Sequence, residues 1–124
     1  MMTFKNVLDK YTQARDCMTS NMEITIKGFD RTTLAPHINF PTLARWLYGS
    51  SKEFLRDYRT ISDKYLVENS DVNVATREQI TGWQIVLSEM VRDFRGKLLE
   101  KFSTSRELVE AVKWENQMVR KLLQ

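Results

Sequence analysis

Apolar residues recur at helical spacing along most of this chain. The stripe over residues 4–19 predicts an amphipathic helix with Thr3 as its N-cap. The longest such pattern predicts a helix over 77–102, and a further one predicts a last helix over 104–123. Because the link at 103–104 is short, we expect these two helices to form an antiparallel hairpin.

Residues 22–27 show a different period. Apolar Met22, Ile24 and Ile26 alternate with polar residues, which predicts a half-buried β-strand that Gly28 ends. A lone strand leaves backbone groups without partners. The strand is therefore expected to pair either with the similar segment 71–75 or with a second copy of the chain, and the second arrangement predicts a homodimer.

The middle of the chain predicts two helices joined by a tight turn. A short helix is expected over 40–48, followed by Gly49, a residue that suits the left-handed position after a helix end. Ser50 and Glu53 have the spacing of a capping box and are expected to begin the next helix, which fades near residue 69.

These patterns predict a mainly α protein with about five helices and one or two short strands. The architecture includes a central helix-turn-helix-like unit and the C-terminal antiparallel helix hairpin. The 124 residues fit one domain over 1–124, and a content of 42% hydrophobic residues disfavours disorder.

The single cysteine, Cys17, cannot form an internal disulfide, so the composition does not favour an oxidising compartment. Charges interrupt the N-terminal segment too early for a signal peptide, and the apolar runs are too short to span a membrane. We expect a cytoplasmic protein without membrane contact. A phage or plasmid that delivers it into a host cytoplasm is equally compatible with the sequence.

The basic residues are unevenly distributed. The net charge is +3, and residues 63–124 carry ten basic and ten acidic side chains. The whole excess therefore falls in residues 1–62, and within these the window 27–59 holds six basic residues against three acidic ones. A local basic excess indicates an anionic partner, although ordinary solvated surface would give the same count.

Motifs for catalysis are absent from the sequence. His37 is the sole histidine, and it is expected to lie in a loop far from Cys17. No CxxC, HExxH, GxGxxG or GxxxxGK[ST] motif occurs. We therefore expect a protein that is not an enzyme and that has no catalytic residues, no cofactor and no metal site.

The segment 43–59 resembles a helix-turn-helix unit, in which the second helix enters the DNA major groove by its N-terminal end. Its basic side chains share the helix face opposite Phe54 and Tyr58, while the two serines at the predicted helix start are placed to reach phosphate oxygens. The alternative is that Glu53, Asp57 and Asp63 neutralise this face. The predicted nucleic-acid-binding residues are Arg45, Ser50, Ser51, Lys52, Arg56 and Arg59.

The same stretch also resembles the ribbon-helix-helix arrangement, in which strands from two chains pair and read the major groove. The resemblance would make Glu23, Thr25 and Lys27 the reading face. The sequence departs from that pattern by extra residues around Pro36 and Pro41 and by the helix that precedes the strand.

The last two predicted helices carry large apolar residues that fit either a core or a partner surface, with the core favoured. The candidates for a partner interface are Trp83, Met90, Phe94, Trp114 and Met118. Charged Arg15 and Glu115 lie on the apolar stripes of the first and last predicted helices, so each needs a partner and the two can pair with each other.

Two functions follow from these observations. The first is a small, non-enzymatic nucleic-acid-binding or regulatory protein that acts as a homodimer through the basic face. The second is a helical protein–protein adaptor, inhibitor or assembly factor, of the kind encoded by phages or plasmids, that does not bind nucleic acid.

Overall fold

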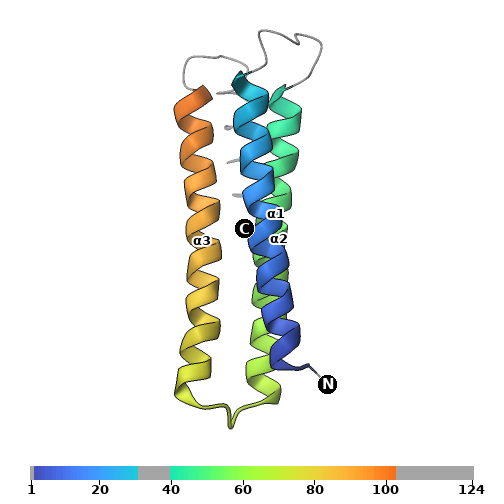
Figure 1. Ribbon diagram of the computed structural model, residues 1–124, viewed down its shortest axis with the longest axis vertical. Coiled ribbons are helices and arrows are strands. Elements are labelled where there is room, and N and C mark those ends of the chain that lie inside the picture. Colours follow the sequence, from blue (N-terminus) through green and yellow to red (C-terminus); the bar gives the residue numbers. More distant parts are fainter. Residues whose placement is uncertain (1, 31–39, 103–124) are drawn as a thin grey trace, which may run out of the picture.

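The computed structural model of this chain describes residues 2–30 and 40–102. Within these ranges it contains three α-helices and no strand: α1 (Phe4–Asp30), α2 (Phe40–Glu68) and α3 (Val74–Phe102). The helices run up, down and up, so α2 is antiparallel to both of the others (Figure 1). The 29 residues of α2 and of α3 each extend about 43 Å.

Burial along α1 and α2 repeats every seven residues, in alternating steps of four and three. This heptad pattern is typical of helices that pack side by side as in coiled coils. On α1 the buried positions are Val7, Tyr11, Ala14, Met18 and Thr25. Half-buried Asn21 occupies the heptad position between Met18 and Thr25. On α2 they are Ala44, Tyr48, Ser51, Leu55, Tyr58, Ser62 and Tyr65. Helices α1 and α2 pack together more extensively than either packs on α3.

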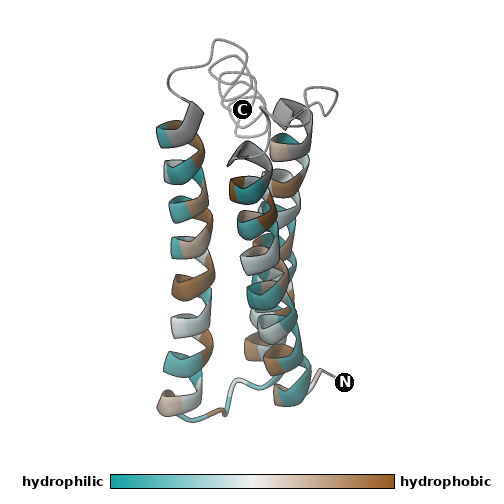
Figure 2. Ribbon diagram, turned by 45° about the horizontal axis from the view of Figure 1, so that its top comes forward, coloured by the Kyte–Doolittle hydropathy of each residue, from teal (hydrophilic) through white to brown (hydrophobic). Residues whose placement is uncertain are grey.

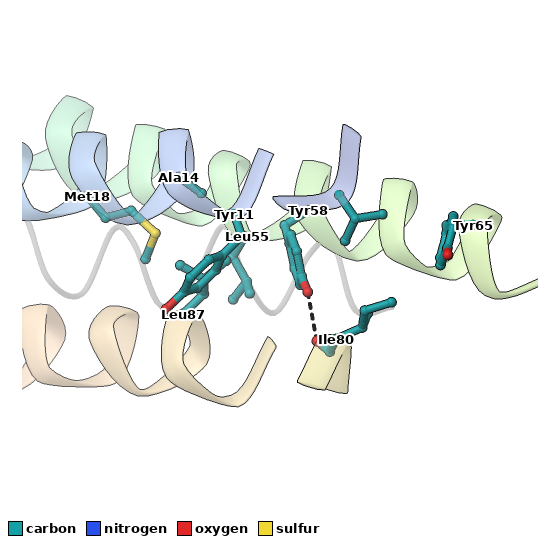
Figure 3. Close-up of a cluster of buried hydrophobic side chains, with 9 residues drawn as sticks. Tyr11, Ala14, Met18, Leu55, Tyr58, Tyr65, Ile80 and Leu87 are labelled. Carbon is teal, nitrogen blue, oxygen red and sulfur yellow. Dashed lines mark hydrogen bonds between the residues drawn. The ribbon is translucent and has the colours of Figure 1, made fainter. Parts of the chain in front are cut away.

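A large aromatic cluster holds the lower part of the bundle in Figure 1 together. The Tyr11 ring stacks on the indole of Trp83 with centroids 5.0 Å apart, which joins α1 to α3. Tyr58 of α2 is fully buried, and its hydroxyl donates a 2.7 Å hydrogen bond to the Ile80 carbonyl of α3 (Figure 3). Burial, and next the nearby Tyr11, raises the pKa of the Tyr58 hydroxyl well above its ordinary value.

A second, smaller cluster lies toward the opposite end. It joins Ala44 and Tyr48 of α2 to Phe94 and Leu98 of α3, with the Tyr48 and Phe94 ring centroids 5.5 Å apart. Figure 2 shows that hydrophobic residues on α3 lie mainly on the side turned to the other helices. The two clusters together line the interior of the described bundle.

Two helix starts have side-chain caps. The Asn6 amide donates to the Thr3 hydroxyl at 3.2 Å, which confirms the predicted cap of α1. At the start of α3 the Thr76 amide donates to the Asn73 side chain at 2.8 Å, so Asn73 caps this helix, which begins at Val74, three residues before the predicted start at residue 77. The segment 71–75 is not a strand, because it forms the turn before α3 and its first residues.

The predicted strand at residues 22–27 is also wrong, because α1 continues to Asp30. Thr25 is buried and Ile24 is 49% exposed, which is the opposite of what the alternation predicted at these two positions. The Thr25 hydroxyl donates to the Asn21 carbonyl at 2.8 Å, so a polar side chain is satisfied inside the helix. Without this strand the ribbon-helix-helix resemblance fails, and the predicted homodimer loses the strand pairing as an argument.

The predicted turn at Gly49 is wrong as well. Helix α2 is continuous from Phe40 to Glu68, and no described glycine has a positive φ. Ser50 therefore lies inside a helix and caps nothing, and the helix-turn-helix unit is absent. About five helices were expected, and the described residues form three. The last predicted helix, at 104–123, lies outside the described residues.

Candidate nucleic-acid interface

The predicted basic residues of α2 lie along one side of a continuous helix. Lys52, Arg56 and Arg59 follow one another at steps of four and three, and Arg45 precedes Lys52 by one heptad. The Arg59 guanidinium donates to the Ser88 hydroxyl of α3 at 3.2 Å. The Lys52 ammonium lies 5.2 Å from the centre of the Tyr48 ring, which itself packs on Phe94. These contacts place the α2 stripe beside α3.

Helix α3 contributes two further basic residues to the same edge of the bundle. Arg92 and Arg95 follow Ser88 at helical steps of four and three, so all three lie on one edge of α3. The Arg59–Ser88 contact shows that this edge faces α2. Both arginines are exposed. We use the name basic seam for the six residues Arg45, Lys52, Arg56, Arg59, Arg92 and Arg95.

The acidic residues of α2 do not all neutralise this seam. The Asp57 carboxylate lies 3.7 Å from the ammonium of Lys10 on α1, so it faces the other side of the helix. Arg56 and Arg59 are exposed, whereas Arg45 and Lys52 are half-buried. Of the three acidic residues that the sequence suggested as neutralising the basic face, Asp57 therefore does not do so, because it faces Lys10 of α1.

The two serines have other roles than the sequence suggested. Ser51 is fully buried, and its hydroxyl donates to the Leu47 carbonyl at 3.0 Å while it accepts from the Asn21 amide at 3.2 Å. It therefore joins α1 to α2 and is not accessible to a phosphate. Ser50 is half-buried within α2, where the backbone offers no helix N-terminus to an anion.

The candidate partner residues on α3 lie mostly in the core. Phe94 is 2% exposed, Met90 is half-buried against the aromatic cluster, and Trp83 is half-buried between Tyr11 and Phe4. Trp114 and Met118 lie outside the described residues. The three predicted interface residues that the structure describes therefore pack within the bundle.

The described ranges contain few side chains that could bind a metal ion or act as a nucleophile. They contain no cluster of three or more histidine, cysteine or acidic side chains that could hold a metal ion. Cys17 is half-buried on α1, and His37 lies outside the described residues. A hollow of about 770 Å³ opens between α1 and α2, where Asp9, Lys10 and Lys64 line it together with uncharged residues.

Sequence reasoning found the α2 half of the seam and missed the α3 half. The spacing of Arg92 and Arg95 was visible, but which edge of α3 meets α2 depends on tertiary packing. The fold and the seam define an all-α bundle of three long helices with a basic edge shared by two of them. No protein-family model, curated protein or solved structure matches this chain. None of the described helices is long and apolar enough to cross a membrane.

Proposed function

We propose that this protein binds the phosphate backbone of nucleic acid through the basic seam. The observation that supports the proposal most is the convergence of six basic side chains from α2 and α3 along one edge of the bundle. Basic side chains aligned along one edge attract a polyanion, which releases its own counterions on binding.

The proposed mode of binding is lateral contact along the seam. On α2 the seam extends from Arg45 to Arg59, which is about 21 Å along the helix axis. Because B-DNA rises 3.4 Å per base pair, this length matches about six base pairs. Arginine suits such contacts because its planar guanidinium binds phosphate oxygens with two donors. Phosphate contacts carry no sequence information, so we expect binding with little sequence preference.

The proposed role is binding without catalysis. Neither a nucleophile–base pair nor a phosphate-cradling loop occurs among the motifs of the sequence, and the seam itself consists of cations. Arginine and lysine side chains at such a surface neutralise and orient an anionic chain. A regulatory or packaging role fits this chemistry.

The experiment is a salt titration of the full chain against a fluorescently labelled duplex and a labelled single strand. The parent protein should bind both, with affinity that falls steeply as salt rises. The triple variant Lys52→Gln, Arg56→Gln, Arg59→Gln should bind more weakly and reduce the slope of log K against log salt by about two to three. Absence of parent binding at low salt would contradict the proposal.

The matched control changes the same number of charges elsewhere. Lys5, Lys27 and Lys64 are exposed, and they lie on α1 or at a position of α2 outside the seam. Changing all three to Gln removes the same net charge. We expect this control to keep most of the salt slope, because a local site loses only its own contacts. An equal loss in both triple variants would indicate general charge attraction and no site.

A second candidate function, the helical adaptor, is supported by one different observation. Trp46 is 76% exposed on α2 and Ile24 is 49% exposed on α1. The contact between Asn21 and the Leu47 carbonyl places both at the same end of the bundle. Exposed tryptophan is typical of protein interfaces. Trp46→Ala should abolish capture of a protein partner from nuclease-treated lysate and leave nucleic-acid affinity unchanged if the adaptor function holds.

A further inference from the structure

Residues 19–27 of α1 are held in the bundle differently from the residues before them. We call this stretch the upper segment of α1, since it lies in the upper part of the helix in Figure 1. Among residues 4–18 the buried side chains are Val7, Tyr11, Ala14 and Met18. In the upper segment only Thr25 is buried, while Met22 and Ile26 are half-buried and Ile24 is exposed. The fully buried apolar series of α1 therefore ends at Met18.

The described hydrogen bonds from the upper segment to α2 come from one side chain. The Asn21 amide donates to the Leu47 carbonyl at 3.3 Å and to the Ser51 hydroxyl at 3.2 Å. The hydroxyls of Thr19 and Thr25 instead donate to carbonyls of α1 itself, so they do not hold α1 against α2. Because water can replace the partners of Asn21, these bonds add little net stability to the packed form.

The sequence of the upper segment does not favour a helix by itself. Ile24, Thr25 and Ile26 are three consecutive β-branched residues, which have lower helix propensity than unbranched ones. The alternation over 22–27 is typical of a strand. Threonine hydroxyls that bond a carbonyl one turn earlier also weaken a helix slightly. A segment whose local preference disagrees with its packed form is typical of functional or strained sites.

The upper segment covers part of the interior. Asn21 lies on Ser51, which is fully buried, and Met22 packs against the smaller cluster around Tyr48 and Phe94. Residues 4–18 are held independently of these contacts, because Tyr11 stacks on Trp83 with centroids 5.0 Å apart. The upper segment can therefore move away from α2 while the large aromatic cluster stays packed.

We propose that the upper segment of α1 opens as a local unit, with a hinge directly after Met18, while residues 4–18 remain packed. The open form exposes Ser51 and the side of the smaller cluster that Met22 covers. The protein then alternates between a closed and an open surface at this end of the bundle. The opening does not depend on the proposed function, since the basic seam lies where α2 meets α3 and the upper segment belongs to α1.

The test is hydrogen exchange of the full chain, read by mass spectrometry on peptides that separate residues 7–18 from 19–27. Amides of 19–27 should exchange on the order of a hundredfold faster, because local opening needs less free energy than unfolding of the core. Low urea should accelerate exchange in 7–18 and leave 19–27 nearly unchanged, since local opening exposes little surface. Equal protection of the two stretches would overturn the proposal.

Leu87→Ala separates local opening from global unfolding. Leu87 is fully buried in the large cluster, which stays packed in the open form. The variant should accelerate exchange in 7–18 by about tenfold or more and leave 19–27 unchanged. Equal acceleration of both stretches would show that they unfold together and would overturn the local unit.

A second variant tests the role of local helix preference without touching the core. Thr19 and Ile24 are exposed, and changing both to Ala should slow exchange in 19–27 about fivefold. The matched control changes exposed Lys5 and Asp9 to Ala, before the hinge, and should leave exchange in 19–27 unchanged. An equal effect of the two double variants on 19–27 would contradict a hinge after Met18.

Discussion

The two ends of this bundle use the same heptad spacing for different purposes. Near the α2–α3 turn, Tyr11, Tyr58 and Trp83 fill the interior and every contact among them serves packing. Toward the other end the buried cluster is small, centred on Tyr48 and Phe94, and cationic side chains border it. We refer to the first as the aromatic end and to the second as the basic end. Because the buried cluster is larger at the aromatic end, we expect that end to contribute more to the stability of the bundle.

The largest expected effect is at the aromatic end. Leu87 is fully buried in the large cluster, and Leu87→Ala should reduce the free energy of unfolding by about 3 kcal/mol through lost transfer energy and a cavity. Leu98→Ala in the smaller cluster should cost about 2 kcal/mol. Urea denaturation measures both. The control Val67→Ala, at a position 79% exposed, should stay within about 0.5 kcal/mol of the parent. A greater loss for Leu98→Ala than for Leu87→Ala would contradict the larger contribution of the aromatic end.

The next effect concerns the hydrogen bond of Tyr58. Tyr58→Phe keeps the ring but leaves the Ile80 carbonyl without its 2.7 Å donor, which should cost about 1–2 kcal/mol. Tyr65→Phe is the matched control, because Tyr65 is also buried in this cluster. Equal losses in the two variants would show that the Tyr58 hydroxyl has no special role.

The same hydroxyl predicts a pH dependence. Its pKa in the folded protein is raised, so the unfolded chain loses this proton first, near pH 10. The stability contributed by Tyr58 is therefore complete below about pH 10 and is lost as the pH rises above that value. Urea midpoints from neutral pH to pH 11 should fall more steeply for the parent than for Tyr58→Phe. Parallel curves would contradict this assignment.

A smaller effect of opposite sign is expected at Gly49, at the basic end. Gly49 lies within α2, and a β-carbon built there meets no atom within 4 Å. Gly49→Ala should raise the free energy of unfolding by about 0.8 kcal/mol, because alanine favours the helix. A turn with a left-handed residue would instead make alanine destabilising. Thermal unfolding thus distinguishes a continuous α2 from a helix-turn-helix unit.

The sequence predicted the helical class, the start of α1 and most of α3, because apolar residues mark those stretches. It failed where the heptad positions are polar or small. Asn21 and Thr25 continue the buried series of α1, and Ser51 continues that of α2, and each is satisfied by a hydrogen bond that only the packed bundle or the formed helix provides. Local signals for a strand and a turn were therefore overridden by long-range packing.

The sequence also predicted only part of the basic seam. Lys52, Arg56 and Arg59 share a face by spacing alone, and the structure keeps them on one side of α2. The predicted contact of Ser51 with a phosphate is wrong, because Ser51 occupies a heptad position of α2 and is fully buried. Arg92 and Arg95 could not be assigned, since the sequence does not tell which edge of α3 meets α2.

The proposed function requires that α2 and α3 build one binding site along the basic seam. The most direct measurement is the salt dependence of duplex binding by the variant Arg92→Gln, Arg95→Gln, compared with Lys5→Gln, Lys27→Gln as a control of equal charge. We predict that the seam variant reduces the slope of log K against log salt by about two, while the control changes it by less than about 0.5. An unchanged slope in the seam variant, or an equal fall in both, would contradict the claim.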